Sequence, residues 1–195
     1  ALAEKTFVEN HKNLIHVSIH AGVGAGIILD HHLYTGLAGT AGEAGHMIVQ
    51  PGGRSCPCGN HGCLEQYISE PAVLSRYREL SGRTTVSIDD LVWAYNQKET
   101  AALAVTDEFT TYLACGINNL WNLFSPECII LNSQLTAYLP QLLPEILQKL
   151  SPRFRATCHL KLSTLQDTGV LLGAARVCIS KYLGTEKLYF SGLQP

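Results

Sequence analysis

Apolar and polar positions alternate along two neighbouring stretches near the start of the chain, and this pattern predicts two strands. The first stretch is LIHVSIH at residues 14–20. The second follows a glycine-rich run and reads GIILDHHLYTG, in which a turn over residues 30–32 leads into a short extension over 33–35. A period of two is typical of half-buried strands, so both stretches are expected to be extended.

Further along the chain, apolar residues recur at helical spacing, and several helix ends are marked. Ser87 followed by Asp90 forms a capping-box pattern that opens a helix, and Pro126 ends a long one. Another segment, LPQLLPEILQKL, carries a proline near its start. These signals predict helices over residues 64–79, 87–95, 100–124, 139–150 and 169–183.

Two short segments between these helices have the composition of strands. ECIIL at residues 127–131 is a continuous apolar run, which is typical of a strand buried on both faces, and residues 158–165 are expected to be extended. The stretch over residues 36–63 is instead rich in glycine and irregular, as functional loops are. Strands and helices alternate, so the sequence predicts an α/β or α+β class.

Composition narrows the class of protein. The 195 residues suffice for one core, or for one domain and part of a second. Hydrophobic residues make up 46% and the formal net charge is −2, so the chain lacks the basic surface that DNA binding needs. No apolar run reaches the roughly 18 residues of a membrane span, and residues 1–14 lack the features of a signal peptide. We therefore expect no membrane contact and a cytoplasmic location.

The most unusual stretch contains His46, Cys56, Cys58 and Cys63, spaced as H-x9-C-x-C-x4-C. Three thiolates and one imidazole suit zinc in a closed tetrahedral site. The alternative is a pair of disulfides or free thiols. An odd number of clustered cysteines, a C-x-C pair too short to bridge comfortably and the nearby histidine favour metal. We therefore expect a structural zinc ion that orders the surrounding loop.

A carboxylate stands near each end of this cluster. Glu43 precedes His46 by three residues, and Glu65 follows Cys63 by two. Carboxylates beside a metal-ordered loop are well placed to accept hydrogen bonds from a polyol, and the second ring nitrogen of His46 could add a further contact. The alternative is that both glutamates are solvated surface charges, and spacing alone leaves the two interpretations open.

The stretch AGEAGHMIVQPGGRSCPCGNHGCLEQYIS resembles the zinc and sugar signature of the ROK family, the bacterial repressors, open reading frames and sugar kinases. The family pattern is close to G-E-x-G-H followed by C-x-C-G-x-x-G-C-x-E-x-x-x-S. The resemblance extends along the chain to residue 183. Each fixed position has its match here, at Gly42, Glu43, Gly45, His46, Cys56, Cys58, Gly59, Gly62, Cys63, Glu65 and Ser69.

The resemblance implies a fold, a metal and a set of sugar contacts. The fold would be an α/β lobe of an actin-like, ribonuclease H-like ATPase with a zinc-binding loop. In this family the first lobe and the catalytic aspartate lie upstream, shortly before an A-L-x-E stretch that ALAE at residues 1–4 resembles. The zinc ligands would be His46, Cys56, Cys58 and Cys63, and the contacts to sugar hydroxyls would come from Glu43, His46 and Glu65.

ROK proteins divide into sugar kinases and transcriptional regulators, which differ in phosphate chemistry. A kinase cradles ATP phosphates with glycine backbone N–H groups and a hydroxyl, and the kinase loop of this family resembles G-T-G-x-G-x-G. Here Val23 takes the place of the threonine, so the loop lacks that hydroxyl. The glycines could also simply form a turn between two strands. We interpret the run as a degenerate phosphate loop made of Gly22, Val23, Gly24 and Gly26.

A second nucleotide contact is altered after the buried strand. Kinases of the family usually follow that strand with a Gly-Gly pair, which lets the backbone approach the nucleotide. This chain has Asn132 and Ser133 there, so side chains are expected to crowd a nucleotide. Two nucleotide contacts are degraded while the sugar signature is intact, and this asymmetry is expected of a sensor rather than of an enzyme.

The sequence therefore predicts a sugar-sensing, oligomerising lobe of a NagC/Mlc-like ROK transcriptional regulator over residues 1–183, with a tail over 184–195. Its partners would be a free or phosphorylated sugar or amino sugar, DNA through an N-terminal domain outside this chain, and further copies in a homodimer or homotetramer. No residue is assigned a catalytic role. The alternatives are an ATP-dependent hexose or N-acetylhexosamine kinase, whose upstream aspartate would deprotonate the sugar, and a zinc-containing interaction module without a ligand.

Overall fold

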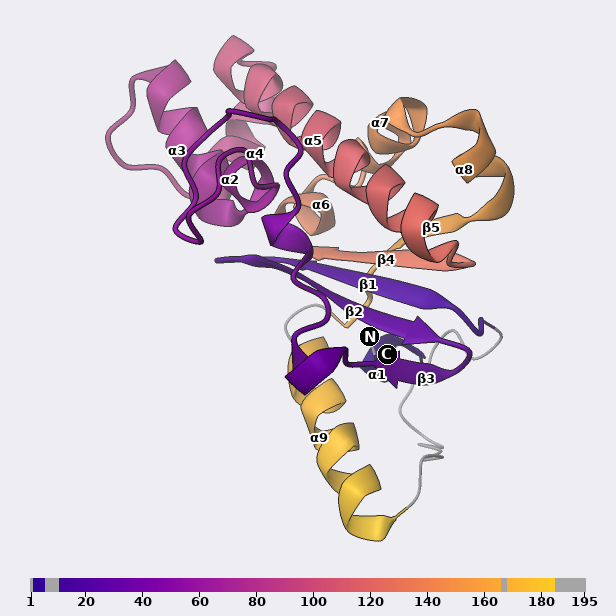
Figure 1. Ribbon diagram of the computed structural model, residues 1–195. Coiled ribbons are helices and arrows are strands. Elements are labelled where there is room, and N and C mark those ends of the chain that lie inside the picture. Colours follow the sequence, from indigo (N-terminus) through magenta and orange to yellow (C-terminus); the bar gives the residue numbers. More distant parts are fainter. Residues whose placement is uncertain (1, 6–10, 166–167, 185–195) are drawn as a thin grey trace.

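The computed structural model describes residues 2–5, 11–165 and 168–184, which form one mixed sheet with helices on both faces (Figure 1). The strand order is β3-β2-β1-β4-β5. Strand β1 pairs antiparallel with β2 and parallel with β4, while β3 extends the antiparallel side and β5 the parallel side. The bounds are β1 (Leu14–Ile19), β2 (Val23–Leu29), β3 (His32–Tyr34), β4 (Cys128–Ser133) and β5 (His159–Leu162).

The two strands predicted near the start of the chain are confirmed, and the second begins earlier than expected. Strand β2 starts at Val23, so most of the glycine run lies inside the strand rather than in a loop. The turn into β3 uses Asp30 and His31 with positive φ angles of 46° and 68°. Turns of this kind match the twist of the flanking strands in a tight hairpin.

Within the described residues, seven α-helices lie on one face of the sheet, the upper face in Figure 1. The longest, α5, carries Phe109, Leu113 and Ile117 into the main buried cluster, which also contains Ile15 and Val17 of β1. The predicted helix over 100–124 is therefore confirmed, and its buried side chains belong to the same core as those of β1. The seven helices are α2 (Glu65–Ile68), α3 (Glu70–Ser81), α4 (Ile88–Asn96), α5 (Thr100–Phe124), α6 (Gln134–Tyr138), α7 (Leu142–Lys149) and α8 (Pro152–Thr157).

The opposite face of the sheet is covered by α9 (Thr168–Leu183), which was predicted, and by the short α1 (Leu2–Lys5), which was not. These two helices pack against each other below the sheet in Figure 1. A second, smaller buried cluster lies on this side and consists of Leu14, Ile28, Cys128 and Ile130. Residues 185–195, most of the predicted tail, lie outside the described residues. None of the described helices has the length and apolar character that would let it cross a membrane.

The single helix predicted over residues 64–79 is wrong, because the chain forms two helices there. Ser69 has an extended backbone with ψ 153° and its hydroxyl accepts a hydrogen bond from the N–H of Ala72 at 3.4 Å, so it caps a new helix. Pro71 lies in the first turn of that helix, where its missing N–H is tolerated. Apolar residues keep their helical spacing across Ser69, so the spacing alone gave no sign of the break.

The segment after the buried strand also differs from the prediction. The helix expected over 139–150 covers only Leu142–Lys149, and α6 and α8 on either side were not predicted. Both additional helices are short, with five residues in α6 and six in α8, so neither has a long apolar period. In α8, the hydroxyl of Ser151 accepts a hydrogen bond from the N–H of Phe154 at 3.1 Å.

The capping box at the start of α4 is present as predicted. The N–H of Ser87 donates to Asp90 Oδ2 at 2.8 Å, and the N–H of Asp90 donates to the Ser87 hydroxyl at 3.2 Å. Hydrogen bonds from the Ser87 hydroxyl and N–H hold the pKa of the Asp90 carboxyl below its usual range. The end of α5 likewise matches the prediction, since Ser125 adopts φ 44° immediately before Pro126.

Replacing the capping serine tests this account of α4. Ser87→Ala removes one of the two reciprocal hydrogen bonds and is expected to lower the free energy of unfolding by about 1 kcal/mol. Urea unfolding followed by circular dichroism measures the change. Thr85→Ala, a change at an exposed position just before the cap, serves as the control. An equal loss in both variants would contradict a specific role for the cap.

Candidate metal centre and ligand site

The proposed phosphate loop forms the tight turn between β1 and β2. The N–H of His20 donates to the carbonyl of Gly22 at 2.9 Å, and Ala21 and Gly22 at the turn are exposed. Val23 is buried in the main core, opposite Ile19 of β1. A threonine hydroxyl at residue 23 would therefore face the core and not the exposed turn. The absence of a hydroxyl at Val23 is thus no evidence for a lost phosphate contact. Ala21 is the exposed side chain of the turn, and it also lacks a hydroxyl.

The remaining glycines of the run also have strand geometry. Gly24 pairs with Ser18 of β1, and Gly26 pairs with His16. Residues inside an antiparallel ladder use their backbone groups in pairing with the neighbouring strand. Only Gly22 of this run lies in the turn, and Val23, Gly24 and Gly26 belong to β2, so its backbone is the end of a turn followed by a strand.

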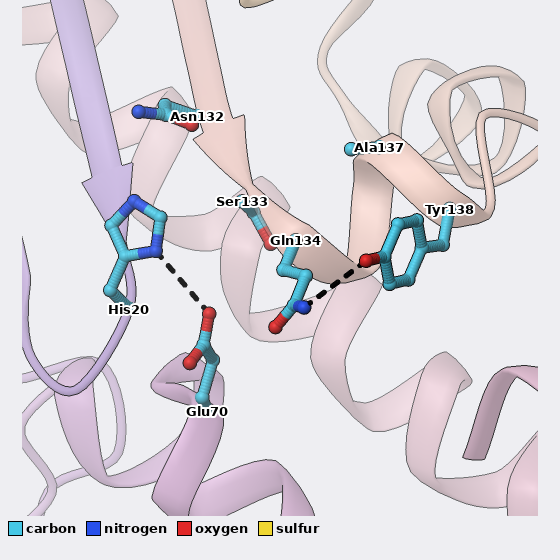
Figure 2. A pocket seen from close by; sticks show the side chains of 7 residues that line it. All are labelled: His20, Glu70, Asn132, Ser133, Gln134, Ala137 and Tyr138. Atoms are coloured by element: carbon cyan, nitrogen blue, oxygen red, sulfur yellow. Dashed lines mark hydrogen bonds and ion pairs between the residues drawn. The ribbon is translucent and has the colours of Figure 1, made fainter. Parts of the chain in front are cut away.

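A polar cavity opens at the ends of β1 and β4 (Figure 2). Asn132 and Ser133 end β4 and are both buried. The Nδ1 atom of His20 lies 3.3 Å from Glu70 Oε1, and the N–H of Glu70 donates to the carbonyl of His20 at 2.9 Å. The cavity has a volume of about 270 Å³, and its lining consists of His20, Glu70, Asn132, Ser133, Gln134, Ala137 and Tyr138.

The lining of the polar cavity bears on phosphate binding. Among the described residues that line it, none is a lysine or an arginine, and Glu70 contributes a carboxylate. A phosphate site normally gathers positive charge or convergent backbone N–H groups. The side chains of Asn132 and Ser133 thus occupy the place where the family resemblance implies glycines in a kinase, and the surrounding charge does not favour a nucleotide phosphate.

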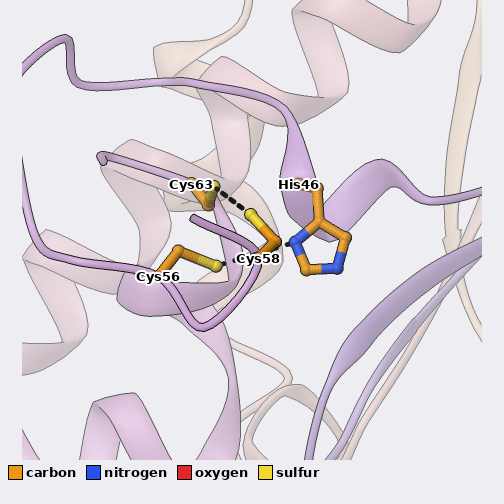
Figure 3. A group of neighbouring side chains, drawn as sticks. All are labelled: His46, Cys56, Cys58 and Cys63. Atoms are coloured by element: carbon orange, nitrogen blue, oxygen red, sulfur yellow. Dashed lines mark hydrogen bonds between the residues drawn. The ribbon is translucent and has the colours of Figure 1, made fainter. Parts of the chain in front are cut away.

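The four predicted metal ligands lie together in the irregular segment before α2 (Figure 3). One ligand atom from each of the four lies within 4.8 Å of the others. Cys56 and Cys63 are buried, Cys58 is exposed, and all three are free of disulfides. The alternative of a pair of disulfides is therefore not supported. The grouped ligands are His46, Cys56, Cys58 and Cys63.

Two distances within the cluster match those expected around a small tetrahedral ion. Tetrahedral metal–sulfur bonds of about 2.3 Å and a metal–nitrogen bond of about 2.0 Å place sulfurs about 3.8 Å apart and sulfur and nitrogen about 3.5 Å apart. Cys58 Sγ lies 3.7 Å from Cys63 Sγ. Cys56 Sγ lies 3.7 Å from His46 Nδ1. The structure therefore holds a four-ligand cluster that could bind a metal ion, with Nδ1 as the imidazole donor.

The thiols of the cluster differ in acidity. Hydrogen bonds from the backbone of Asn60 and from Cys56 lower the pKa of Cys58 to about 7. Burial raises the pKa of Cys63 to about 12. Near neutral pH, Cys58 is thus the more readily ionised of the two. A bound cation would stabilise the thiolate form of every cysteine ligand.

Glycines let this segment, the metal loop (residues 42–66), fold closely on itself and on β2. The carbonyl of Gly42 accepts a hydrogen bond from the N–H of Ala25 at 2.7 Å. A Cβ on Gly42 would collide with the Ala25 carbonyl, and one on Gly45 would collide with the Val23 carbonyl. Gly62 has φ +81°, and a Cβ there would meet the Gln50 carbonyl. Three glycines of the motif, Gly42, Gly45 and Gly62, are therefore required by close backbone approach.

The three candidate sugar contacts have different surroundings. Glu43 has an exposed side chain at 69% accessibility, and its Oε2 lies 3.7 Å from His46 Nε2. This separation is too long for a good hydrogen bond, so a ligand hydroxyl could join the two groups. Glu65 is half-buried, and its Oε2 accepts a hydrogen bond from the N–H of Val23 at 3.0 Å. Glu65 thus joins the metal loop to the turn between β1 and β2.

A network that sequence analysis missed fastens the metal loop to the helices. The Nε2 of Gln66 lies 3.6 Å from Cys56 Sγ and donates towards it. Arg54 donates to the carbonyl of Gln66 at 2.8 Å, pairs with Glu108 of α5 at 2.5 Å, and lies over the Tyr67 ring at 4.5 Å. Gln66 and Arg54 stand inside the quoted motif and could have been considered. Glu108 is 54 residues beyond Arg54 and carries no signal in the sequence.

A matched pair of glycine substitutions tests the packing of the metal loop. Gly59 and Gly62 both have positive φ, but only Gly62 faces a neighbouring carbonyl at short range. Gly62→Ala is therefore expected to reduce bound metal well below about one ion per chain, whereas Gly59→Ala should retain more of it. Atomic absorption after gel filtration measures the content. Equal retention by the two variants would contradict the role assigned to the Gly62 contact.

Comparison with known sequences gives relatives along most of the chain. The sequence matches the model of the ROK family over residues 1–181. It is 34% identical to the xylose repressor of Bacillus spizizenii over 194 residues, which cover 96% of this chain and 50% of the repressor. It is also 34% identical to the transcriptional dual regulator NagC of Escherichia coli over 156 residues, which cover 75% of this chain and 38% of NagC. The chain thus spans half or less of these relatives.

Solved structures include a regulator and a kinase with the same fold. A ROK family transcriptional regulator, a homolog of the MLC protein of E. coli, has a TM-score of 0.75 and 32% identity and matches 89% of this chain and 48% of its own. A ROK hexokinase from Thermus thermophilus has a TM-score of 0.76 and 25% identity. The match covers 90% of this chain and 60% of the hexokinase. The predicted actin-like, ribonuclease H-like α/β lobe is confirmed. The chain belongs to the ROK family.

Proposed function

We propose that this chain is the effector-binding part of a sugar-responsive ROK transcriptional regulator and that it holds a structural zinc ion. A set of three sulfurs and one imidazole nitrogen favours zinc over magnesium or calcium, which prefer oxygen ligands. Four protein ligands leave no open position, so the ion would order the metal loop and take no part in chemistry. Its ligands would be His46, Cys56, Cys58 and Cys63.

The sugar would bind at the edge of the metal loop. Glu43 and His46 Nε2 face each other across 3.7 Å, a separation that one sugar hydroxyl could bridge by donating to the carboxylate and accepting from the ring. Glu65 would contact another hydroxyl while it keeps its hydrogen bond to the N–H of Val23. These contacts place the sugar against both the metal loop and the hairpin turn, so its binding would favour one arrangement of these two segments.

One observation favours a regulator over a kinase: the polar cavity, where a nucleotide would be expected, carries the carboxylate of Glu70 and the side chains of Asn132 and Ser133. Phosphoryl transfer depends on positive charge and backbone donors around the phosphates. The exposed turn residue Ala21 adds no hydroxyl. The names of the relatives agree, since several are called xylose repressors and one is the regulator NagC.

The remaining parts of the proposal concern the protein beyond this lobe. DNA contacts would come from a domain N-terminal to it, which agrees with the formal net charge of −2 of the chain described here. The effector would be a sugar or amino sugar, free or phosphorylated. The protein would act in the cytoplasm as a homodimer or homotetramer, in which a change in one lobe alters the spacing of the DNA-binding domains.

A kinase assay on the full-length, zinc-loaded protein separates the regulator from the alternative, an ATP-dependent sugar kinase, which the similarity to the Thermus hexokinase favours. We expect no ADP release with xylose, glucose or N-acetylglucosamine, and a rise in melting temperature with at least one of these sugars. Turnover of about 1–100 per second would contradict the proposal and establish an enzyme.

A cysteine substitution tests whether the zinc ion supports sugar binding. Cys58→Ser removes one ligand and is expected to weaken metal affinity by more than about 10-fold, since even partners outside the ligand set cost that much. The sugar-induced rise in melting temperature should fall with it. Cys115→Ser, at a free cysteine on α5 outside the cluster, is the control. Full sugar affinity in metal-depleted Cys58→Ser would show that the ion and the sugar site are independent.

A further inference from the structure

The polar cavity is lined by none of the residues assigned above to the metal or to the sugar. It lies where the parallel strands β1 and β4 end, beside the start of α3 and against α6 (Figure 2). In sheets with parallel strands, ligands bind beyond the carboxyl ends of those strands. We propose that the polar cavity is a second ligand site, which takes a small neutral molecule that carries several hydroxyl or amide groups.

The hydroxyl of Ser133 is the observation that points to a ligand. Ser133 is 4% exposed, and its Oγ has no hydrogen-bond partner among the described residues. It lines the cavity, on the side shared with Gln134 and across from His20 and Glu70 (Figure 2). A buried hydroxyl left without a partner destabilises a protein, and a hydroxyl or amide of a bound molecule would supply the missing hydrogen bond.

The charge of the lining decides which class of molecule fits. His20 and Glu70 face each other at 3.3 Å, so the carboxylate already has one donor and the cavity carries no surplus of positive charge. Among the described lining residues, no lysine or arginine balances an incoming anion. A phosphate or a carboxylate ligand would approach Glu70 at the cost of repulsion. A neutral ligand avoids this cost and can donate to the carboxylate.

The other lining groups suit a ligand that both donates and accepts hydrogen bonds. The amide of Gln134 offers both kinds of group, as does the hydroxyl of Tyr138, and the two meet only at a long 3.4 Å. Ala137 is the one apolar side chain among the described lining residues. Hydroxyl groups of a polyol match this mixture, because each can donate one hydrogen bond and accept others.

The size of the cavity limits the ligand further. Its volume of about 270 Å³ lies just below the roughly 300–1,000 Å³ of typical small-molecule sites. A monosaccharide or a short linear polyol has a suitable size, whereas a nucleoside triphosphate is too large and too highly charged. A neutral molecule would therefore bind at the place where a kinase of the family would bind its nucleotide.

Ligand-observed NMR on the full-length, zinc-loaded protein tests the proposal with five probes. The neutral probes are xylitol, D-xylose and N-acetylglucosamine, and the anionic probes are pyrophosphate and magnesium ATP. We expect at least one neutral probe to bind saturably with a dissociation constant near or below about 1 mM. In Ser133→Ala its affinity should fall roughly 3- to 10-fold, which corresponds to one lost hydrogen bond.

Two further variants make this result specific. Ser133→Ala itself should fold with an unchanged or higher melting temperature, because it removes an unpartnered buried hydroxyl. The first further variant, Ser75→Ala on the exposed side of α3, should leave probe affinity unchanged. Glu43→Gln should weaken sugar binding at the metal loop and leave the Ser133-dependent binding intact, so that failure of one site is distinguishable from failure of the other.

Three outcomes would overturn the proposal. The first is that no neutral probe binds, which leaves the cavity to water. The second is that binding of the neutral probes does not change in Ser133→Ala. The third is that pyrophosphate or magnesium ATP binds more tightly than every neutral probe and loses affinity in Ser133→Ala, which would make the cavity a phosphate site.

Discussion

The convergence of four metal-type ligands on one point is the main constraint on a segment that contains little regular secondary structure. Between β3 and α2 the regular structure consists of the 3-10 turns η1 (Leu37–Gly39) and η2 (Ala44–His46) and two isolated bridges, Ile48 with Cys63 and Ser55 with His61. Ordering the backbone costs about 1–2 kcal/mol per residue. A metal ion bound by the cluster would offset much of this cost, since metal binding and folding are coupled.

The same segment sets the position of its neighbours. The N–H of Leu64 donates to the carbonyl of Met47 at 2.8 Å, so the start of α2 is tied to the part of the loop that follows His46. Glu65, one residue later, reaches the N–H of Val23. Arg54 and Arg76 both pair with Glu108 of α5. The cluster, the hairpin turn and the longest helix are therefore connected by direct hydrogen bonds and ion pairs.

The metal cluster could be predicted in full from the sequence. All its ligands lie within one short segment, and their residue types and spacing are typical of a metal site. The strands and the long helix α5 could also be predicted, since their apolar periods are regular. The break at Ser69 could not be seen in the period alone, because the apolar pattern continues across it while the cap interrupts the hydrogen bonding. The direction of the Val23 side chain depends on the strand register, and the polar cavity joins His20, Glu70 and Ser133 from distant parts of the chain.

The orientation of His46 has a consequence for the chemistry of the loop edge. Its Nδ1 faces the sulfurs, and its Nε2 faces Glu43. An imidazole that binds a cation through Nδ1 must carry its proton on Nε2, so an ion bound here would fix the tautomer of the ring. The outward nitrogen would then be a hydrogen-bond donor for as long as the ion stayed bound. The ion would thus determine the position of the imidazole. It would also determine the partner of Nε2, which must be an oxygen that accepts a hydrogen bond.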